Sequence, residues 1–393
     1  MSDWDSYLPE DWRQATLVGR AVLGCEDPAL QGPSVVSVVD GAVFDLTHRF
    51  STIAHLCAAD RPAEAAKDVS GLAPVCRVSE LIAHSIAPGA KRAAPCLLAP
   101  NDLQVVKAAG VTFAASLLER IIEEKAGGDV SRAKALRDEL TGVIGSDLSK
   151  IVPGSEDAKT LERHLRAIGY WSQYLEVGIG PDAELFTKAP ILSSVGFGAE
   201  IGLHPRSSWN NPEPEIVVVV APDQNIVGAS LGNDVNLRDF EGRSALLLGK
   251  AKDNNASCAV GPFIRLFDAH FTLDDVRRAD VDLRIEGEDG YLLRGASTMR
   301  EISRDVADLV AQAAGATHQY PDGFVLFTGT LFAPTEDRDA SGMGFTHKIG
   351  DRVSISSPKL GGLVNTVTTS DKAAPWTFGV CALMDNLRAR NAI

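Results

Sequence analysis

Two glutamates separated by one proline stand directly before an apolar run of the 393-residue sequence. Glu213-Pro214-Glu215 leads into Ile216-Val217-Val218-Val219-Val220, a β-branched segment typical of a buried strand. In an extended chain, residues i and i+2 point to the same face, so both carboxylates project together. Two like charges in one place repel, and their removal from water adds to the cost. A divalent cation would remove that cost, so the pair predicts a metal site.

A third carboxylate follows in Gly232-Asn233-Asp234-Val235, where a glycine begins a turn after the next apolar segment. Glu213, Glu215 and Asp234 together offer hard oxygen ligands, which suit Mg²⁺, with Mn²⁺ as a substitute. A solvated acidic strand end is the alternative interpretation of the Glu-x-Glu pair taken by itself.

The elements that must position these carboxylates are mostly strands. Apolar or β-branched runs between turn residues predict strands over 216–220, 225–231, 244–248, 324–328 and 353–356. Helical patterns interrupt them at about 272–279 and 299–314, and the stretch 102–126 also reads as helical. Strands and helices show no regular alternation, so the pattern predicts an α+β fold.

The first hundred residues alternate short apolar runs with turns. Asp40-Gly41 between two apolar runs predicts a hairpin, and residues 78–86 have a helical pattern. A Pro- and Gly-containing stretch at 87–95 then suggests a domain boundary. We therefore expect a small N-terminal α/β domain over 1–100 and a catalytic domain over 101–393, with a helical insertion around 126–185.

Charge and cysteine content exclude several classes of protein. The chain has 38 Lys and Arg against 52 Asp and Glu, a formal net charge of −14. Such an acidic surface repels phosphate backbones, which argues against nucleic acid as a partner. The apolar runs are too short to span a bilayer, and the acidic N-terminus carries no secretory signal. Six cysteines without a CxxC pair are typical of reduced thiols. We expect a cytoplasmic protein that binds neither membrane nor nucleic acid.

Together with further motifs in the same order, the acidic pair resembles the fumarylacetoacetate hydrolase superfamily over about residues 100–393. The residues that carry the resemblance are Glu213-Pro214-Glu215, Gly232-Asn233-Asp234-Val235 with Arg238-Asp239, Lys252 nine residues before Gly261-Pro262, Thr328-Gly329-Thr330, Gly350-Asp351-Arg352-Val353 and Gly361-Gly362-Leu363-Val364-Asn365.

The resemblance implies a mixed β-sandwich roll with Mg²⁺ held by Glu213, Glu215 and Asp234. It also implies a substrate pocket lined by the following candidates: Lys252 as a catalytic residue, and Arg238, Thr330, Ser194 and Glu241 as substrate contacts. Lys250 is two residues from Lys252, so a shift in register to Lys250 stays open.

One departure from the family pattern bears on the reaction. Many members carry a His-x-x-Glu pair that activates water for C–C bond hydrolysis, and here Ser116 replaces the His while Glu119 is kept. A serine hydroxyl does not titrate near pH 7, so it cannot replace the histidine as a base. The departure favours an acid/base reaction run by Glu119, as in the 2-keto-3-deoxy-pentonate dehydratase branch of the superfamily, which this chain resembles.

We therefore expect a Mg²⁺-dependent dehydratase that converts a 2-keto-3-deoxy-D-pentonate to 2-oxoglutarate semialdehyde. Enolisation at C3 and loss of the C4 hydroxyl would be the chemical steps. The alternative within the same fold is a metal-dependent C–C bond hydrolase or decarboxylase of acylpyruvate-type substrates, and a metal-containing binding protein is a further class. The partner would be a small 2-keto-3-deoxy sugar acid, and the assembly a homodimer or a dimer of dimers.

A different chemistry is suggested by Gly228-Ala229-Ser230-Leu231-Gly232, which satisfies the G-x-S-x-G pattern of a serine hydrolase. Such an elbow leads from a strand straight into a helix. The following Asn233-Asp234-Val235-Asn236 is a poor helix start, so we expect Ser230 to lie within a strand.

Overall fold

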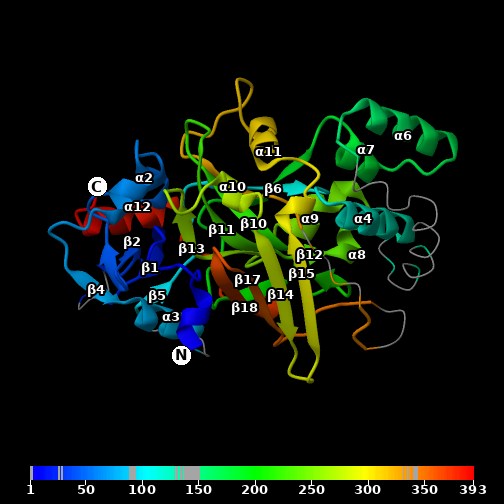
Figure 1. Cartoon of the computed structure of the whole chain (residues 1–393). Helices are drawn as coiled ribbons and strands as arrows, with labels where there is room; N and C mark the ends of the chain where they lie inside the picture. The colour runs from blue at the N-terminus through cyan, green and yellow to red at the C-terminus, as the bar shows by residue number, and fades with distance from the viewer. Residues whose placement is uncertain are drawn as a thin grey trace.

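The protein is described by a computed structural model of the whole chain (Figure 1). The structure describes residues 3–24, 27, 30–87, 94–127, 129, 132, 136, 151–330, 332, 334, 336–339 and 344–393.

Most strands belong to one large mixed sheet. In chain order they are β1 (Leu17–Val22), β2 (Pro33–Val39), β3 (Ala42–Asp45), β4 (Pro74–Arg77), β5 (Cys96–Leu97), β6 (Val105–Gly110), β7 (Glu184–Ala189), β10 (Pro214–Val220), β11 (Ile226–Asp234), β13 (Cys258–Leu266) and β16 (Phe324–Phe327). Their order in the sheet is β4-β3-β2-β1-β13-β11-β10-β16-β6-β7, and β5 pairs with β1. The N-terminal strands thus continue the sheet that carries β10 and β11, and the expected boundary at residue 100 stays a prediction.

A smaller sheet packs against the large one. Its strands are β8 (Glu200–Leu203), β14 (Asp280–Glu286), β15 (Leu292–Thr298), β17 (Arg352–Ser357) and β18 (Gly361–Thr369), in the order β15-β14-β17-β18-β8. Strand β14 alternates buried apolar with exposed polar residues, so only one of its faces joins the core. Strand β10 is buried along its whole length, as its unbroken β-branched sequence requires. One apolar cluster contains side chains of both sheets, among them Val218 and Leu283.

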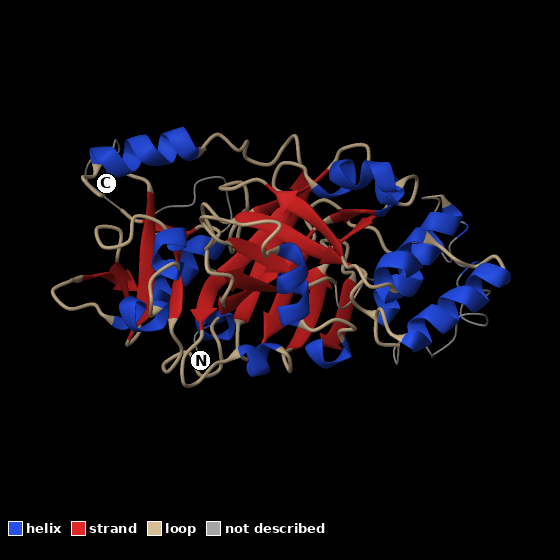
Figure 2. Cartoon of the chain, turned by 90° about the horizontal axis from the view of Figure 1, so that it is seen from above, coloured by secondary structure: helices blue, strands red, loops and turns tan. Residues whose placement is uncertain are grey.

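Helices gather at both ends of this strand-rich centre, and further helices lie against its middle (Figure 2). They are α1 (Ile53–Cys57), α2 (Pro62–Lys67), α3 (Val78–Ile86), α4 (Ala114–Ala126), α6 (Glu156–Ala167), α7 (Gln173–Ile179), α8 (Arg238–Glu241), α9 (Leu248–Lys252), α10 (Leu273–Val276), α11 (Val306–Ala313) and α12 (Val380–Ala389). Short 3₁₀ helices span Asp3–Tyr7, Ala245–Leu247 and Met299–Glu301. Helices α4, α6 and α7 lie together at one end of the molecule and share an apolar cluster of their own (Figure 1). Among the described residues, none of these helices has the length and apolar character to cross a membrane.

The predicted α+β class is confirmed, and so are the hairpin at Asp40-Gly41 and the helix over 78–86. The helix expected over 102–126 is wrong in its first half, which forms β6 before α4 begins. Strand β6 pairs in parallel with the distant β16, and this tertiary pairing overrides the local pattern. The predicted helices near 272–279 and 299–314 are shorter, as α10 and α11.

The strand expected over 244–248 is also wrong. Ser244 accepts a hydrogen bond from the Leu246 N–H at 3.2 Å and caps a 3₁₀ turn that runs into α9. Leu246 is 95% exposed, so the apolar residues of this segment do not form a buried strand.

Within the range of the expected insertion, around 126–185, the structure describes the helices α6 and α7, and Glu184 already begins β7. The insertion itself stays a prediction. Residues 128, 130, 131, 133–135 and 137–150 of this insertion lie outside the described residues. Five of the six cysteines are described and all five are free thiols, while Cys25 lies outside the described residues.

Candidate metal and catalytic centre

Three buried carboxylates meet where β10 begins and β11 ends. These strands pair antiparallel with Glu215 opposite Gly232, which brings Asp234 beside Glu213. One oxygen from each of Glu213, Glu215 and Asp234 lies within 4.8 Å of the other two. We call these three residues the acidic triad. Their side chains are almost fully buried, so their charges require compensation inside the protein.

Lysines and an arginine supply part of that compensation. The Lys252 ammonium contacts the Glu213 carboxylate and lies 3.1 Å from Asp234 Oδ2. The Lys188 ammonium lies 2.8 Å from Asp234 Oδ1, and the Arg120 guanidinium contacts Glu213. Two of the three triad carboxylates are therefore paired with cations.

Glu215 differs from its two neighbours. It accepts a hydrogen bond from the Gly329 N–H at 2.7 Å, and no ion pair to it is found among the described residues. Burial, followed by the charges of Asp234 and Glu213, raises the pKa of Glu215 well above its usual range. Gly329 has a φ of +99°, and a Cβ there would lie 1.9 Å from Thr112 Oγ1, so the turn that holds Glu215 requires glycine.

These features fit a divalent cation. Three carboxylate oxygens form the donor set that Mg²⁺ and Mn²⁺ prefer. No cation pairs with Glu215 among the described residues, and a divalent ion would supply the missing positive charge. Among the described residues, this is the one group of three or more His, Cys, Asp or Glu side chains with metal-ligand spacing.

Helix α4 contributes two buried charged residues that the sequence analysis did not consider. Arg120 and Glu123 are three residues apart and share one helix face. Arg120 Nη1 lies 2.7 Å from Glu123 Oε2 and 2.9 Å from Glu241 Oε2, and Arg238 Nε lies 3.1 Å from Glu123 Oε1. The candidates Arg238 and Glu241 are thus joined to the acidic triad through α4. In the sequence, the signal for this role is a charged residue placed among the apolar positions of an amphipathic helix.

Strand β7 contributes a second set of residues, none of which was predicted as a site residue. Glu184, Phe186 and Lys188 alternate along this strand and lie on the same face, as strand periodicity requires. The Phe186 ring centre lies 5.7 Å from the Lys252 ammonium. Glu184 lines the cavity beside the triad and has no hydrogen bond or ion pair within the described part of the chain. Burial, with the charge of Glu241, raises the pKa of Glu184 to about 7.

Most predicted site residues line one cavity. Its walls include Glu213, Glu215, Asp234, Glu241, Lys252 and Thr330, together with Arg120, Glu184 and Phe186. The space between these side chains is about 10 Å³, roughly the room of one water-sized group, so a sugar acid would have to displace side chains. Thr330 Oγ1 donates to the Phe332 carbonyl at 3.0 Å. Lys252 is buried at this cavity, whereas Lys250 is exposed.

Three candidates, Arg238, Glu119 and Ser194, are not among the residues that line this cavity. Glu119 is a partly buried residue of α4 and is not among the residues that line the cavity. Ser194 is also absent from the lining, and its Oγ lies 3.4 Å from Asn101 Nδ2 and 3.6 Å from Cys258 Sγ. The side chain of Ser116 is outside what the structure describes. The roles of Glu119 and Ser194 stay predictions.

Ser230 lies inside β11, as expected. Its side chain is fully buried, and its hydroxyl donates to the Phe263 carbonyl at 2.9 Å. The chain continues as a strand through Asp234 and does not turn into a helix, so Ser230 lacks the setting of an exposed nucleophile.

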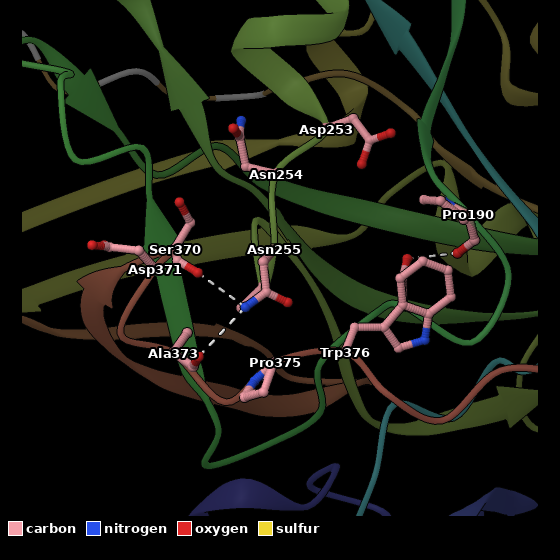
Figure 3. Close-up of a pocket in the computed structure, with 11 residues that line it drawn as sticks. Pro190, Asp253, Asn254, Asn255, Ser370, Asp371, Ala373, Pro375 and Trp376 are labelled. Atoms are coloured by element: carbon pink, nitrogen blue, oxygen red, sulfur yellow. Dashed lines mark hydrogen bonds between the residues drawn. The ribbon is translucent and has the colours of Figure 1, made fainter.

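A larger and more open cavity of about 480 Å³ lies beside the loop that follows Lys252 (Figure 3). None of its walls belongs to the cavity of the acidic triad. It is lined by Pro190, Ser193, Asp253, Asn254, Asn255, Ala256, Ser370, Asp371, Ala373, Pro375 and Trp376. The Asn255 amide donates to the Ser370 carbonyl at 3.0 Å and so joins two of these segments (Figure 3).

Two curated proteins resemble this chain in sequence. A protein of Haloferax volcanii named "Probable 2-keto-3-deoxyxylonate dehydratase" is 30% identical over 196 residues, which cover 50% of this chain and 64% of that protein. A 2-dehydro-3-deoxy-D-arabinonate dehydratase of Saccharolobus solfataricus is 30% identical over 187 residues, 47% of this chain and 58% of that protein. The matches thus span less than two thirds of each relative.

Solved structures share the fold. The apo form of a 2-keto-3-deoxy-D-arabinonate dehydratase superposes with a TM-score of 0.59 at 19% identity, covering 90% of this chain and 99% of that chain. The same coverage and identity, with a TM-score of 0.58, hold for a 2-keto-3-deoxy-D-arabinonate dehydratase complexed with magnesium and 2,5-dioxopentanoate. A fumarylacetoacetate hydrolase of Exiguobacterium antarcticum has a TM-score of 0.55 at 17% identity, covering 90% of this chain and all of that one.

A family model described as "Fumarylacetoacetate (FAA) hydrolase C-terminal" matches residues 156–368, which is more than half of the chain. The matched range contains the whole acidic triad as well as Lys188 and Lys252. With the fold and these residues in place, the chain belongs to the fumarylacetoacetate hydrolase family and carries its α+β fold with an additional N-terminal region.

Proposed function

We propose that the protein is a Mg²⁺-dependent dehydratase of 2-keto-3-deoxy-pentonates, with 2-oxoglutarate semialdehyde as product. The observation that carries this proposal is the buried acidic triad, with the unpaired Glu184 on the wall of the same cavity. Both curated relatives are named as dehydratases of such acids, and the related magnesium complex contains 2,5-dioxopentanoate, another name for that product.

Glu213, Glu215 and Asp234 would hold the cation. When bound, the cation would polarise the 2-keto group of the substrate and lower the cost of removing a proton from C3. The protein residues then have two tasks, which are to orient the acid and to move protons between C3 and the C4 hydroxyl.

Glu184 is the acid/base group that the geometry favours. Its carboxyl lines the cavity without a partner among the described residues, so it is free to exchange a proton with a substrate. With a pKa of about 7 it holds or releases a proton near neutral pH, as an acid/base catalyst must. It would take the C3 proton and return a proton to the departing C4 hydroxyl, which leaves as water. Tautomerisation of the resulting enone, with protons lost from C5 and its hydroxyl and gained at C3 and C4, would then give the C5 aldehyde. Glu119, expected from the sequence to act as the base, remains the competing candidate.

Lys252 would stabilise negative charge on the substrate oxygen as the enolate forms. Its ammonium lies at the wall of the cavity and is held by two triad carboxylates. Arg238 and Thr330 would position the acid. Arg238 Nη2 is buried and has no hydrogen-bond partner within the described residues, so it has a donor to offer. Ser194 and Glu241 are the remaining proposed substrate contacts.

A panel of 2-keto-3-deoxy acids, with and without Mg²⁺ and with product identification by mass, tests the proposal. Loss of one water in the presence of Mg²⁺ supports the dehydratase. Cleavage of acylpyruvates, or loss of carbon dioxide, supports the hydrolase or decarboxylase alternative. Metal binding without turnover of any member of the panel would indicate a binding protein.

A further inference from the structure

Lys188 on β7 is a fully buried lysine whose ammonium is enclosed by four oxygen atoms. It lies 2.8 Å from Asp234 Oδ1 and donates to the Val235 carbonyl at 3.1 Å. It also donates to the carbonyl of Lys252 and lies 3.5 Å from Ser257 Oγ. A lysine ammonium has three donors. The two carbonyls and the Ser257 hydroxyl accept all three hydrogen bonds, and the contact with Asp234 Oδ1 is an ion pair.

The four oxygens belong to the two segments that build the acidic side of the cavity. Asp234 ends β11 and carries one triad carboxylate, and Val235 follows it directly. Lys252 ends α9, and its carbonyl is also held by the Ser257 hydroxyl at 2.8 Å. The Lys188 ammonium thus binds the side chain of a triad residue and the backbone of the lysine whose own ammonium lies on that triad.

Lys188 does not reach the substrate space. Its side chain has no exposed surface, and it is not among the residues that line the cavity of the triad, although its strand neighbours Glu184 and Phe186 are. Any effect of Lys188 on that cavity must act through Asp234 and Lys252.

We propose that Lys188 is a positioning residue, which fixes the Asp234 carboxylate relative to Lys252 and so sets the affinity of the triad for its metal. This inference rests on the metal site of the proposed function, but it does not depend on the identity of the substrate. Residues that contact a metal-binding side chain hold it in the orientation that the metal requires. Loss of such a residue lowers metal affinity roughly tenfold to a hundredfold.

The test is calorimetric titration of the full-length protein with Mg²⁺, and separately with Mn²⁺, in the absence of substrate. Lys188→Met keeps the length of the side chain but removes the ammonium, and we expect its metal affinity to fall about tenfold to a hundredfold. Lys107→Met on the adjacent β6 is the matched control. Lys107 donates to Thr187 Oγ1 at 3.1 Å on the partly exposed side of the same strand pair, so its loss leaves the affinity unchanged.

The melting temperature with and without metal separates positioning from a general structural role. A positioning role predicts that Lys188→Met loses much of the rise in melting temperature that Mg²⁺ causes in the wild type. A lower melting temperature with unchanged metal affinity would overturn the proposal. Where Lys188→Met does not fold, Lys188→Gln replaces it. The same loss of affinity is expected because a neutral amide cannot form the ion pair with Asp234.

The result of the metal titration does not depend on the result of the dehydratase assay. Weaker metal binding in the Lys188 variants supports the positioning role even if no 2-keto-3-deoxy acid is turned over. Equal binding in the wild type and both variants overturns the role of Lys188 alone. A wild type that binds neither Mg²⁺ nor Mn²⁺ overturns the metal site and this inference together.

Discussion

Arg120 on α4 forms an ion pair with the triad residue Glu213, although the two residues stand 93 positions apart in the sequence. The same guanidinium lies 2.7 Å from Glu123 and 2.9 Å from Glu241. Three buried carboxylates therefore share one guanidinium, while Lys252 and Arg238 supply a second cation to Glu213 and Glu123. Helix α4 belongs to an apolar cluster separate from that of the sheets, so this ion-pair network is what joins it electrostatically to the acidic triad.

Removal of Arg120 should destabilise the protein strongly. Arg120→Gln leaves the buried Glu241 without the cation that pairs with it and removes one of two cations from Glu213 and Glu123. We expect the free energy of unfolding to fall by about 3–5 kcal/mol. Arg166→Gln is the control, because Arg166 on α6 pairs with Glu162 and Glu176 in largely exposed positions and should cost less than about 1 kcal/mol. Urea unfolding at pH 7 measures both variants. Equal losses would show that the Arg120 network contributes no more than a surface pair.

The acidic triad should bind one divalent ion. Glu215→Gln keeps the shape of the side chain but removes its charge, and the loss of Mg²⁺ affinity should exceed the roughly tenfold to hundredfold cost of losing an outer partner. Glu286→Gln, at the partly exposed last residue of β14, should bind Mg²⁺ as the wild type does. Chelation should abolish turnover, and added Mg²⁺ should restore it. Full turnover in a metal-free preparation would refute the metal site.

Mutation distinguishes the two acid/base candidates, Glu184 and Glu119. Glu184→Gln should lower kcat by roughly 10²–10⁴ and leave Mg²⁺ affinity almost unchanged, because Glu184 lines the cavity but is not part of the triad. Glu119→Gln should change kcat by less than about threefold if Glu184 is the catalyst. Steady-state kinetics at saturating Mg²⁺ measure both. The opposite pattern would return the role to Glu119.

Glu184 should also affect the pH dependence of stability. The pKa of Glu184 is raised from 4.5 to about 7, chiefly by burial, so the folded protein holds a proton that the unfolded chain has released. Stability of the metal-free protein therefore falls as pH rises from about 4.5 through 7. Relative to the wild type, Glu184→Gln should gain roughly 1–3 kcal/mol between pH 5 and pH 8. Unfolding curves at both pH values measure this gain. If the variant and the wild type differ in stability by the same amount at both pH values, Glu184 is ionised in the folded protein at both pH values.

The reaction itself should be a dehydration. A 2-keto-3-deoxy-pentonate should lose one water without cleavage of a carbon–carbon bond, because the cavity offers an acid/base carboxyl and a lysine but no histidine among its described walls. The product should carry an aldehyde, and solvent deuterium should enter C3. Mass spectrometry and NMR follow both. Pyruvate with a two-carbon fragment, or turnover of acylpyruvates alone, would favour the lyase or hydrolase alternative.

The acidic triad could be predicted because the relationships that build it are short in sequence. Glu213 and Glu215 share a face through the two-residue period of a strand, and Asp234 ends the strand that follows in a hairpin. Periodicity and turn residues encode such local geometry directly. The burial of β10 agrees with the same reading of the sequence. Lys252 was expected from the family resemblance instead, and Lys252 is buried whereas Lys250 is exposed.

The partners of the triad were decided by packing between distant segments. Arg120 reaches Glu213 only because α4 follows β6, and β6 pairs with β16, more than 200 residues along the chain. Lys188 and Glu184 reach the site because β7 pairs with β6 at the edge of the same sheet. The sequence determined which carboxylates gather, since local periodicity controls that. The tertiary structure decided which cations neutralise them and which carboxyl stays unpaired, because long-range pairing of strands brings those side chains together.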